Sequence, residues 1–206
     1  MTEQEYAERN MKGFEGDGIM KAEFENLIKR YNVKGVIETG TYHGGTARAL
    51  SSMVEHVATI EFNEKNYLEA KNNLIGFSNV GVNLGNSAEV LEENIEDLDI
   101  FGDKGRVMFF LDAHWQEYCP LLDELKVIAK NDWRLPPIIV IHDFFVPNTD
   151  LGYDEYKGQK FDYEYIREHI EAIYLKHNGF NYYYNDKTGA EGARRGVIYI
   201  VPNEND

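Results

Sequence analysis

Two almost wholly apolar runs constrain the fold of this chain more than any other feature of its sequence. They are RVMFFLDA at 106–113 and PPIIVIHDF at 136–144. A strand that is apolar throughout is buried on both faces, because a strand with one face in water alternates apolar and polar residues. Segments with the apolar spacing of helices alternate with strand-like segments along the chain. This alternation predicts an α/β fold whose mostly parallel sheet is covered by helices on both faces.

The other elements follow from the same periodicities. We expect strands at 35–39, 56–62, 80–85, 106–113 and 136–144, and helices at 19–31, 46–53, 64–75, 87–98 and 162–177. The chain ends differently, because segments 180–185 and 196–201 predict an antiparallel hairpin. No linker divides the 206 residues, which suit one core, so we expect a single domain over 1–206.

The charge balance argues against one class of partner. The chain has 21 Lys and Arg against 36 Asp and Glu, a formal net charge of −15 at pH 7. Because neutralising phosphates requires a basic face, we expect no nucleic-acid partner. No apolar run approaches the roughly 20 residues that span a bilayer, and the polar start MTEQEYAERN lacks the apolar core of a secretion signal. With Cys119 as the single cysteine, the expected location is the reducing cytoplasm, with no membrane partner.

A glycine-rich turn follows the first expected strand in VIETGTYHGGTARAL, residues 36–50. In open parallel sheets such a turn lies at the carboxyl ends of the strands, where ligands bind. A dinucleotide turn reads G-x-G-x-x-G, but Tyr42 occupies the place of the second glycine, which disfavours a close pyrophosphate. No G-K-[ST] follows, so a P-loop is excluded.

Two acidic residues indicate the kind of ligand. Glu61 ends the second expected strand about 20 residues after the first glycine, where an acid accepts hydrogen bonds from ribose hydroxyls. Glu38 precedes the turn and favours a ligand with an ammonium or sulfonium charge over one with phosphates. S-adenosylmethionine has these features. The competing interpretation is that a glutamate at a strand end is a solvated rim residue.

Four motifs in order resemble those of the class I S-adenosylmethionine-dependent methyltransferases, in particular the metal-dependent O-methyltransferases that include catechol O-methyltransferase. They are VIETGTYHGGTA, TIEFN, GNSAEVL at 85–91 and FFLDAHW at 109–115. The resemblance covers about residues 16 to 144. It implies a Rossmann-like, doubly wound class I methyltransferase fold, which the terminal hairpin also suits.

The resemblance implies a set of cofactor contacts. Glu38 and Gly40 lie near the methionine amino group, Tyr42 and Thr46 near the methionine end, and Glu61 on the ribose. Four further residues complete the set around the adenine: Phe62 against it, Gly85 and Ser87 at its edge, and Trp115 in its wall. Asp112 is also expected among the cofactor-binding residues. The family also uses its N-terminal region as a cover, so segment 11–18 within an N-terminal helical cap, 1–30, is expected to close over the cofactor.

A metal site is expected at the ends of the two apolar strands. The resemblance implies Asp112 as a metal ligand, and Asp143 ends the adjacent strand, so both carboxylates converge on a divalent cation such as Mg²⁺ or Mn²⁺. His142 is a third candidate ligand, and an imidazole suits Mn²⁺ better than Mg²⁺. Consecutive strand residues point to opposite faces, so His142 and Asp143 share a site only if the strand ends between them. The alternatives are a loop-bonded His142 and a helix-capping Asp143.

The general base and the substrate are less constrained. The spacing Asp112-x-His114 is similar to that in the metal-dependent sugar O-methyltransferases, which implies His114 as base. The alternative is that a metal-bound hydroxyl takes the proton. The catechol enzymes have a lysine after the tryptophan and an Asp-Asn pair at the next strand end. Here Gln116 and HDF stand there, which puts a catechol substrate in doubt.

Two loops are candidates for substrate contact. Segment 144–161 is rich in aromatics and glycine and is the expected substrate loop, with Phe144, Tyr153 and Tyr156 as its walls or as a seal over the sheet end. Arg194 and Arg195 are expected either to bind an anionic substrate group or to pair with a neighbouring acid.

Together these features predict a cytoplasmic S-adenosylmethionine-dependent O-methyltransferase, metal-assisted, that acts on a small hydroxylated molecule such as a sugar or a phenol. The alternatives are a nicotinamide-dependent reductase on a dinucleotide fold and a non-catalytic S-adenosylmethionine-binding module. The N-terminal helix or the final hairpin is the expected contact of a homodimer, or neither is, so the oligomeric state stays open.

Overall fold

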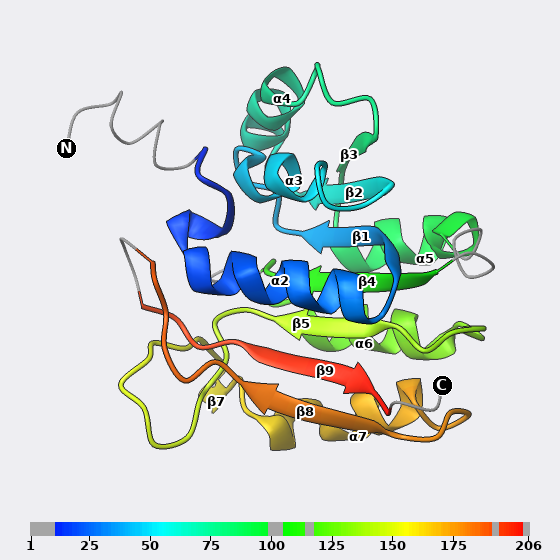
Figure 1. Ribbon diagram of the computed structural model, residues 1–206, viewed down its shortest axis with the longest axis vertical. Helices are drawn as coiled ribbons and strands as arrows, with labels where there is room; N and C mark the ends of the chain where they lie inside the picture. Colours follow the sequence, from blue (N-terminus) through cyan, green and yellow to red (C-terminus); the bar gives the residue numbers. More distant parts are fainter. Residues whose placement is uncertain (1–10, 99–104, 114–117, 191–193, 204–206) are drawn as a thin grey trace.

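Seven strands form one twisted sheet in the computed structural model, which describes residues 11–98, 105–113, 118–190 and 194–203 (Figure 1). The strand order is β3-β2-β1-β4-β5-β9-β8. The bounds are Val33–Thr39 for β1, His56–Glu61 for β2, Val80–Leu84 for β3, Arg106–Leu111 for β4, Ile138–Ile141 for β5, Phe180–Tyr184 for β8 and Ile198–Pro202 for β9. Strands β1 to β5 pair in parallel, and β9 runs antiparallel to both β5 and β8. The predicted α/β sheet with an antiparallel hairpin is confirmed.

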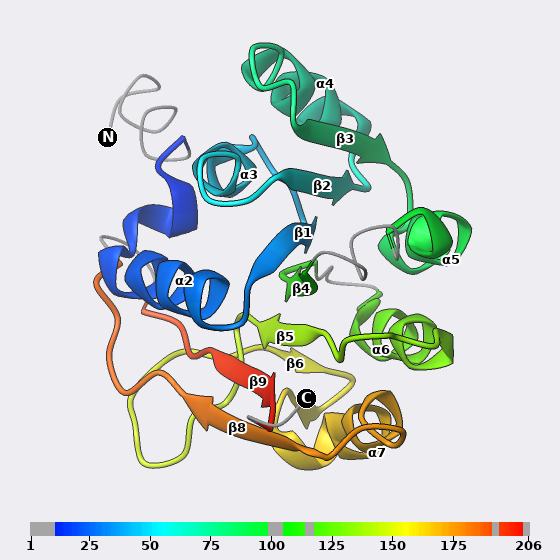
Figure 2. The same cartoon turned by 45° about the vertical axis from the view of Figure 1, so that its right-hand side comes forward.

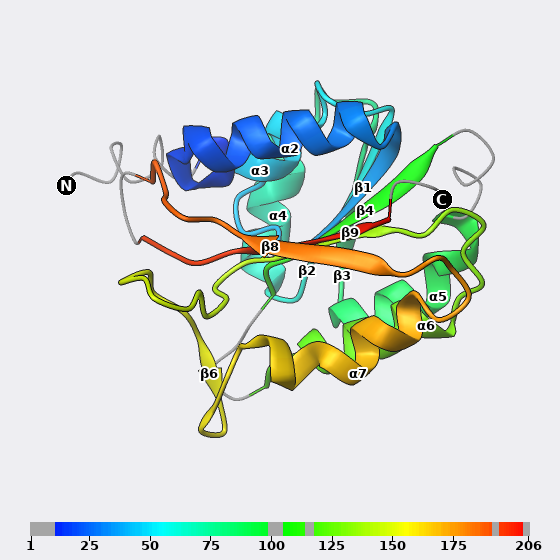
Figure 3. The same cartoon turned by 60° about the horizontal axis from the view of Figure 1, so that its bottom comes forward.

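Helices cover both faces of the sheet, as the apolar strands require. Helices α2 (Gly18–Arg30), α3 (Gly45–Leu50) and α4 (Glu64–Asn73) lie on one face, and α5 (Ser87–Leu98), α6 (Leu121–Lys130) and α7 (Tyr163–Ile173) lie on the other (Figure 3). Figure 2 shows α5, α6 and α7 in succession along one side. Each face of the sheet has its own hydrophobic core, and β4 contributes residues to both. Phe109 packs with α5 to α7, and Phe110 packs with α2.

The N-terminal helix is packed within the chain itself. Met20, Phe24, Leu27 and Ile28 of α2 are buried at helical spacing, whereas Ile19, expected on the same face, is 39% exposed. The Asp17 side chain caps this helix by accepting hydrogen bonds from the backbone N–H groups of its first turn. The apolar face of α2 is therefore covered by the sheet and is not an open contact surface.

One helix and one small hairpin have no counterpart among the expected elements. Helix α6 buries Leu121, Leu125 and Ile128 at helical spacing, although no helix was expected there. Inside the expected substrate loop, β6 (Glu155–Tyr156) and β7 (Gln159–Lys160) form a small hairpin. Its two turn residues, Lys157 and Gly158, have φ angles of 52° and 79°, the left-handed backbone of a tight hairpin turn.

Smaller differences concern where helices end. Helix α3 ends at Leu50 rather than 53, and α7 ends at Ile173 rather than 177. Among the described helices, none has the length and apolar character needed to cross a membrane.

Candidate active site at the carboxyl ends of the central strands

The site lies where the order of the strands reverses. Strand β1 leads through α3 to β2 on one side, while β4 lies on its other side. Ligands of open α/β sheets bind outside the carboxyl ends of the strands at this point. A cavity of about 320 Å³ lies there, lined by Lys12, Glu15, Glu38, Gly40, Thr41, Tyr42, His43, Gly45, Thr46 and Asp112. Four of the residues predicted for the cofactor and Asp112 therefore share one cavity.

Gly40 allows the glycine turn to approach the end of β4. Its φ is 85°, and a Cβ atom at this position would lie 2.4 Å from the carbonyl oxygen of Asp112. The backbone N–H of Gly40 donates to the carbonyl of Ile60 in β2. The absence of a side chain at position 40 thus joins the ends of three strands around the cavity.

Glu38 is a buried carboxyl group near the end of β1. It is 2% exposed, and its Oε2 accepts a hydrogen bond of 2.6 Å from the Thr59 hydroxyl. Burial is the main reason that the pKa of Glu38 is raised to about 8. The Thr59 hydrogen bond opposes this rise, and the charges of Asp112 and Glu61 add to it. Glu38 is therefore mostly protonated at neutral pH until a cationic group comes close enough to lower its pKa.

Glu61 ties the glycine turn to the end of β2. Its Oε2 accepts a 2.7 Å hydrogen bond from the Tyr42 N–H, and its Oε1 accepts one of 2.8 Å from the Asn63 N–H. Burial raises the pKa of Glu61, and these backbone hydrogen bonds oppose that rise. The Phe62 N–H and the Asn66 side chain also hydrogen-bond to this carboxylate, so several protein donors hold it in place. Glu61 is therefore a buried and oriented acid, and the competing interpretation of a solvated residue at the strand end is wrong.

The two aromatic residues next to these acids lie near the surface. Tyr42 has a left-handed φ of 50° and stacks on the His43 ring, with ring centroids 3.9 Å apart. The Phe62 side chain is 57% exposed. Large exposed rings beside a buried acid are suited to stacking on a planar ligand.

Thr46 is held by the N-terminal segment. The Phe14 N–H donates a 3.0 Å hydrogen bond to its hydroxyl, and the turn η1 (Gly13–Gly16) packs on α3 so closely that a Cβ at Gly13 would lie 2.5 Å from that of Ala49. Lys12 and Glu15 of this segment line the cavity. Segment 11–18 thus lies beside the cavity, as expected of a cover, whereas its contact with a cofactor stays a prediction.

Gly85 follows β3 and Ser87 begins α5, and neither residue lines the cavity. Gly85, with a φ of 150°, donates its N–H to the carbonyl of Glu61. The Ser87 hydroxyl donates to the carboxylate of Glu124, a fully buried residue of α6. The sequence reasoning missed Glu124 because it missed α6.

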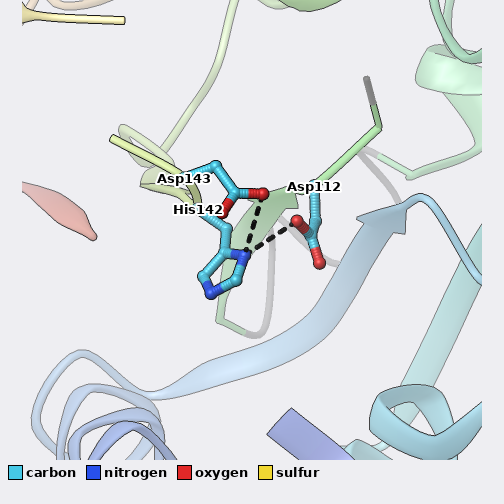
Figure 4. Close-up of side chains that lie close together, drawn as sticks. All are labelled: Asp112, His142 and Asp143. Carbon is cyan, nitrogen blue, oxygen red and sulfur yellow. Dashed lines mark hydrogen bonds and ion pairs between the residues drawn. The ribbon is translucent and has the colours of Figure 1, made fainter. Parts of the chain in front are cut away.

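Asp112, His142 and Asp143 form a compact cluster (Figure 4). The His142 Nδ1 lies 3.0 Å from the Asp112 Oδ1 and 3.5 Å from the Asp143 Oδ2. Strand β5 ends at Ile141, and Asp143 has a left-handed φ of 55°, so both residues turn to the same side. The condition that the strand must end for them to share one site is met.

The cluster already balances much of its negative charge. Burial lowers the pKa of His142, but the carboxylates of Asp112 and Asp143 outweigh it and raise the pKa well above 6.5. An imidazolium therefore lies between two carboxylates in the metal-free protein. One nitrogen and two carboxylate oxygens lie within 4.8 Å of one another, close enough to be ligands of one divalent ion. The donor set fits a divalent cation after loss of the His142 proton.

Arg195 and Arg194 pair with neighbouring acids. The Arg195 guanidinium donates to the carboxylates of both Asp143 and Asp154, and Arg194 lies 3.1 Å from the exposed Asp150. Both arginines were expected either to bind an anionic substrate group or to pair with a neighbouring acid, and in the structure they pair with acids. No helix begins between 143 and 154, so Asp143 does not act as a helix cap.

The remaining residues expected at the site are the aromatic residues of segment 144–161 and residues 114–116. Phe144 is wrong as a substrate wall, because it is fully buried in the core and lies 6.3 Å from the Tyr184 ring. Tyr153 and Tyr156 are half-buried on the loop. His114, Trp115 and Gln116 lie outside the described residues.

No protein-family model matches the chain, and no curated protein sequence does. Solved structures do match. A candidate caffeoyl-CoA O-methyltransferase from Staphylococcus aureus has a TM-score of 0.60 at 20% identity, covering 97% of this chain and 90% of that one. An O-methyltransferase from Bacillus cereus in complex with S-adenosylhomocysteine has 0.58 at 17%, covering 89% and 81%. Spermidine synthase from Thermotoga maritima has 0.56 at 15%, covering 93% and 62%. At these identities the matches bear on the fold alone, and by that measure the chain has the Rossmann-like fold of the class I S-adenosylmethionine-dependent methyltransferases.

Proposed function

We propose that the chain is an S-adenosylmethionine-dependent O-methyltransferase. The observation that carries this proposal is the buried Glu38 in a cavity at the strand reversal, lined by three acids and one lysine. A cofactor with ammonium and sulfonium charges suits such a cavity, and a pyrophosphate does not. The fold shared with an O-methyltransferase crystallised with S-adenosylhomocysteine supports the same conclusion.

The resemblance and the geometry support a set of proposed cofactor-binding residues. Glu38 is proposed for the methionine ammonium, with Gly40, Tyr42 and Thr46 around the methionine end. Glu61 is proposed for the ribose hydroxyls, which the orientation of its carboxylate by two backbone N–H groups supports. The proposed contacts of the adenine side are Phe62, Gly85, Ser87 and Trp115, and Asp112 lines the same cavity.

The chemistry is an in-line displacement on the sulfonium carbon, which requires a substrate oxygen held about 3 Å from the methyl group and deprotonated. Asp112, Asp143 and His142 are proposed to hold a divalent cation, Mg²⁺ or Mn²⁺, which would orient the substrate oxygens and lower the pKa of the attacking hydroxyl. As a ligand of this cation His142 would not be available as a base, so His114 remains the proposed base.

The proposed substrate is a small hydroxylated molecule, a sugar or a phenol. Tyr153 and Tyr156 are half-buried on the segment that also carries Asp154, and they are the proposed aromatic walls. A cytoplasmic location, a homodimer and the absence of nucleic-acid and membrane partners stay predictions.

The nicotinamide-reductase alternative is not favoured. A common dinucleotide-binding sheet has six parallel strands in the order 3-2-1-4-5-6. Here an antiparallel β9 lies between β5 and β8, and Tyr42 occupies the place of the second glycine. Turnover distinguishes the enzyme from the remaining alternative, a non-catalytic cofactor-binding module.

The test is the formation of S-adenosylhomocysteine from S-adenosylmethionine with a panel of sugars and phenols, with Mg²⁺, Mn²⁺ or a chelator. We expect turnover with at least one hydroxylated class, and we expect Asp112→Asn to reduce it by at least about a hundredfold, the scale of losing one metal ligand or electrostatic contact. Turnover that the chelator and Asp112→Asn leave unchanged would contradict the metal-assisted mechanism. Cofactor binding without turnover of any substrate would favour the non-catalytic module.

A further inference from the structure

Arg195 holds a carboxylate that the proposed metal site needs. Its Nε donates to the Oδ1 of Asp143, while the other oxygen of that carboxylate faces His142. Asp143 is 5% exposed, so little solvent screens this ion pair. A divalent cation at the Asp112, His142 and Asp143 cluster would therefore compete with the guanidinium for the same side chain.

The backbone around Arg195 is shaped to hold the guanidinium in place. Gly152 donates its N–H to the carbonyl of Arg194 at 2.7 Å and accepts a 2.9 Å hydrogen bond from the N–H of Gly196. A Cβ atom at Gly152 would lie 3.0 Å from the Nη1 of Arg195. The loop before β9 and the loop after β5 thus enclose the arginine side chain between them.

Asp154 gives the guanidinium a second partner. The Nη2 of Arg195 donates to the Asp154 carboxylate, and the Asp154 N–H donates to the carbonyl of Asp143 at 2.8 Å. Arg195 can therefore release the side chain of Asp143 while it stays paired with Asp154. The change is local, because all three residues belong to segments that already touch.

We propose that Arg195 is a built-in competitor of the divalent cation. It neutralises Asp143 in the metal-free protein, and it moves to Asp154 alone when a cation takes the Asp143 carboxylate. This inference rests on the proposed metal site. Metal binding is consequently weakened by the ion pair and is coupled to the 150–156 segment, which carries the proposed walls of the substrate site.

The test compares Mn²⁺ affinities by electron paramagnetic resonance of the unbound Mn²⁺, at constant pH and ionic strength. A charge-assisted hydrogen bond contributes enough to change an affinity by tenfold to hundredfold, so Arg195→Gln should bind Mn²⁺ at least about tenfold more tightly than wild type. Arg194→Gln removes the same charge one residue away, from an exposed pair with Asp150, and should change the affinity by less than about threefold. Arg195→Lys keeps the charge but cannot bridge both carboxylates as a fork does, and should give an intermediate gain.

Each outcome decides the question. Tighter Mn²⁺ binding in Arg195→Gln but not in Arg194→Gln would support competition between Arg195 and the cation for Asp143. The same holds if wild type binds Mn²⁺ too weakly to detect and Arg195→Gln binds it measurably. Equal gains in both variants would reduce the effect to net charge and overturn the proposal. Equal Mn²⁺ binding in wild type and Arg195→Gln would overturn it too, while leaving the metal site intact. If Mn²⁺ binds none of the folded variants, the competition and the metal site fail together, and the binding of S-adenosylmethionine is a separate measurement.

Discussion

Replacing Glu38 with glutamine should change how the stability of the protein depends on pH. Glu38 is fully buried beside the acids of the cavity, and burial raises its pKa to about 8 from the ordinary 4.5. Glutamine keeps the shape and still accepts the hydrogen bond from the Thr59 hydroxyl. The substitution therefore removes the ionisation and leaves most of the packing.

The sign and the size follow from linkage. Because the pKa is raised in the folded chain, the contribution of Glu38 is most favourable below pH 4.5 and is lost as the pH rises through about 8. With these two pKa values, ionisation costs the folded state about 0.8 kcal/mol at pH 5 and about 3.3 kcal/mol at pH 7. Between pH 5 and pH 7, Glu38→Gln should thus gain about 2.5 kcal/mol relative to wild type.

Urea unfolding at pH 5, 6 and 7 measures this difference directly. Glu64→Gln is a matched control, because Glu64 is an exposed residue of α4 and its substitution should leave the wild-type pH dependence unchanged. If the unfolding free energies of wild type and Glu38→Gln run parallel between pH 5 and pH 7, the carboxyl is not held protonated, and the reasoning about the cavity is refuted.

Two further predictions concern the packing around the site. Gly40→Ala should lower the free energy of unfolding in urea by more than about 3 kcal/mol, because a left-handed alanine is strained and its Cβ would clash with the Asp112 carbonyl. The control is Gly158→Ala, which has a similar φ of 79° but open space around it and should lose only about 1 kcal/mol. Equal losses would show that the close approach of the turn to β4 is not a constraint. In thermal melting, Leu125→Ala in α6 should lower the free energy of unfolding by about 2–5 kcal/mol, because Leu125 is fully buried. Leu68 in α4 is 58% exposed, and Leu68→Ala should lower it by less than about 0.5 kcal/mol. A small loss at Leu125 would argue against α6 as part of the core.

The sequence predicted the parts of the fold that depend on local periodicity. The strands that became β4 and β5 are apolar throughout, and the residues that follow them, Asp112 and Asp143, meet because adjacent parallel strands end at the same edge. Glu38 and Glu61 were found for the same reason, since each lies at or near the end of a strand.

The parts that were missed depend on tertiary contacts or on short segments. Helix α6 has a readable signal in Leu121, Leu125 and Ile128, but it spans only Leu121–Lys130 and follows a stretch without periodicity. The β6–β7 hairpin has two residues a side, too few for a period.

The ion pairs of the site could not be predicted from a sequence pattern. Asp143 and Arg195 are 52 residues apart and meet because β9 pairs with β5. Phe144 was expected as a substrate wall or as a seal over the sheet end because its segment is rich in aromatics, and the chain, which turns at Asp143, buries the ring in the core. Which side of a turn a residue faces is decided by backbone geometry that the residue types alone do not specify.

The central claim is that the cavity at the carboxyl ends of β1 and β4 binds S-adenosylmethionine. Calorimetric titration of S-adenosylmethionine and S-adenosylhomocysteine into wild type, Glu61→Ala and the exposed control Glu64→Ala tests it most directly. We predict micromolar-range binding of both ligands to wild type and to the control, and a loss of at least about tenfold in Glu61→Ala, the scale of one or two charge-assisted hydrogen bonds. No heat for either ligand with wild type, or equal affinity in Glu61→Ala, would contradict the account.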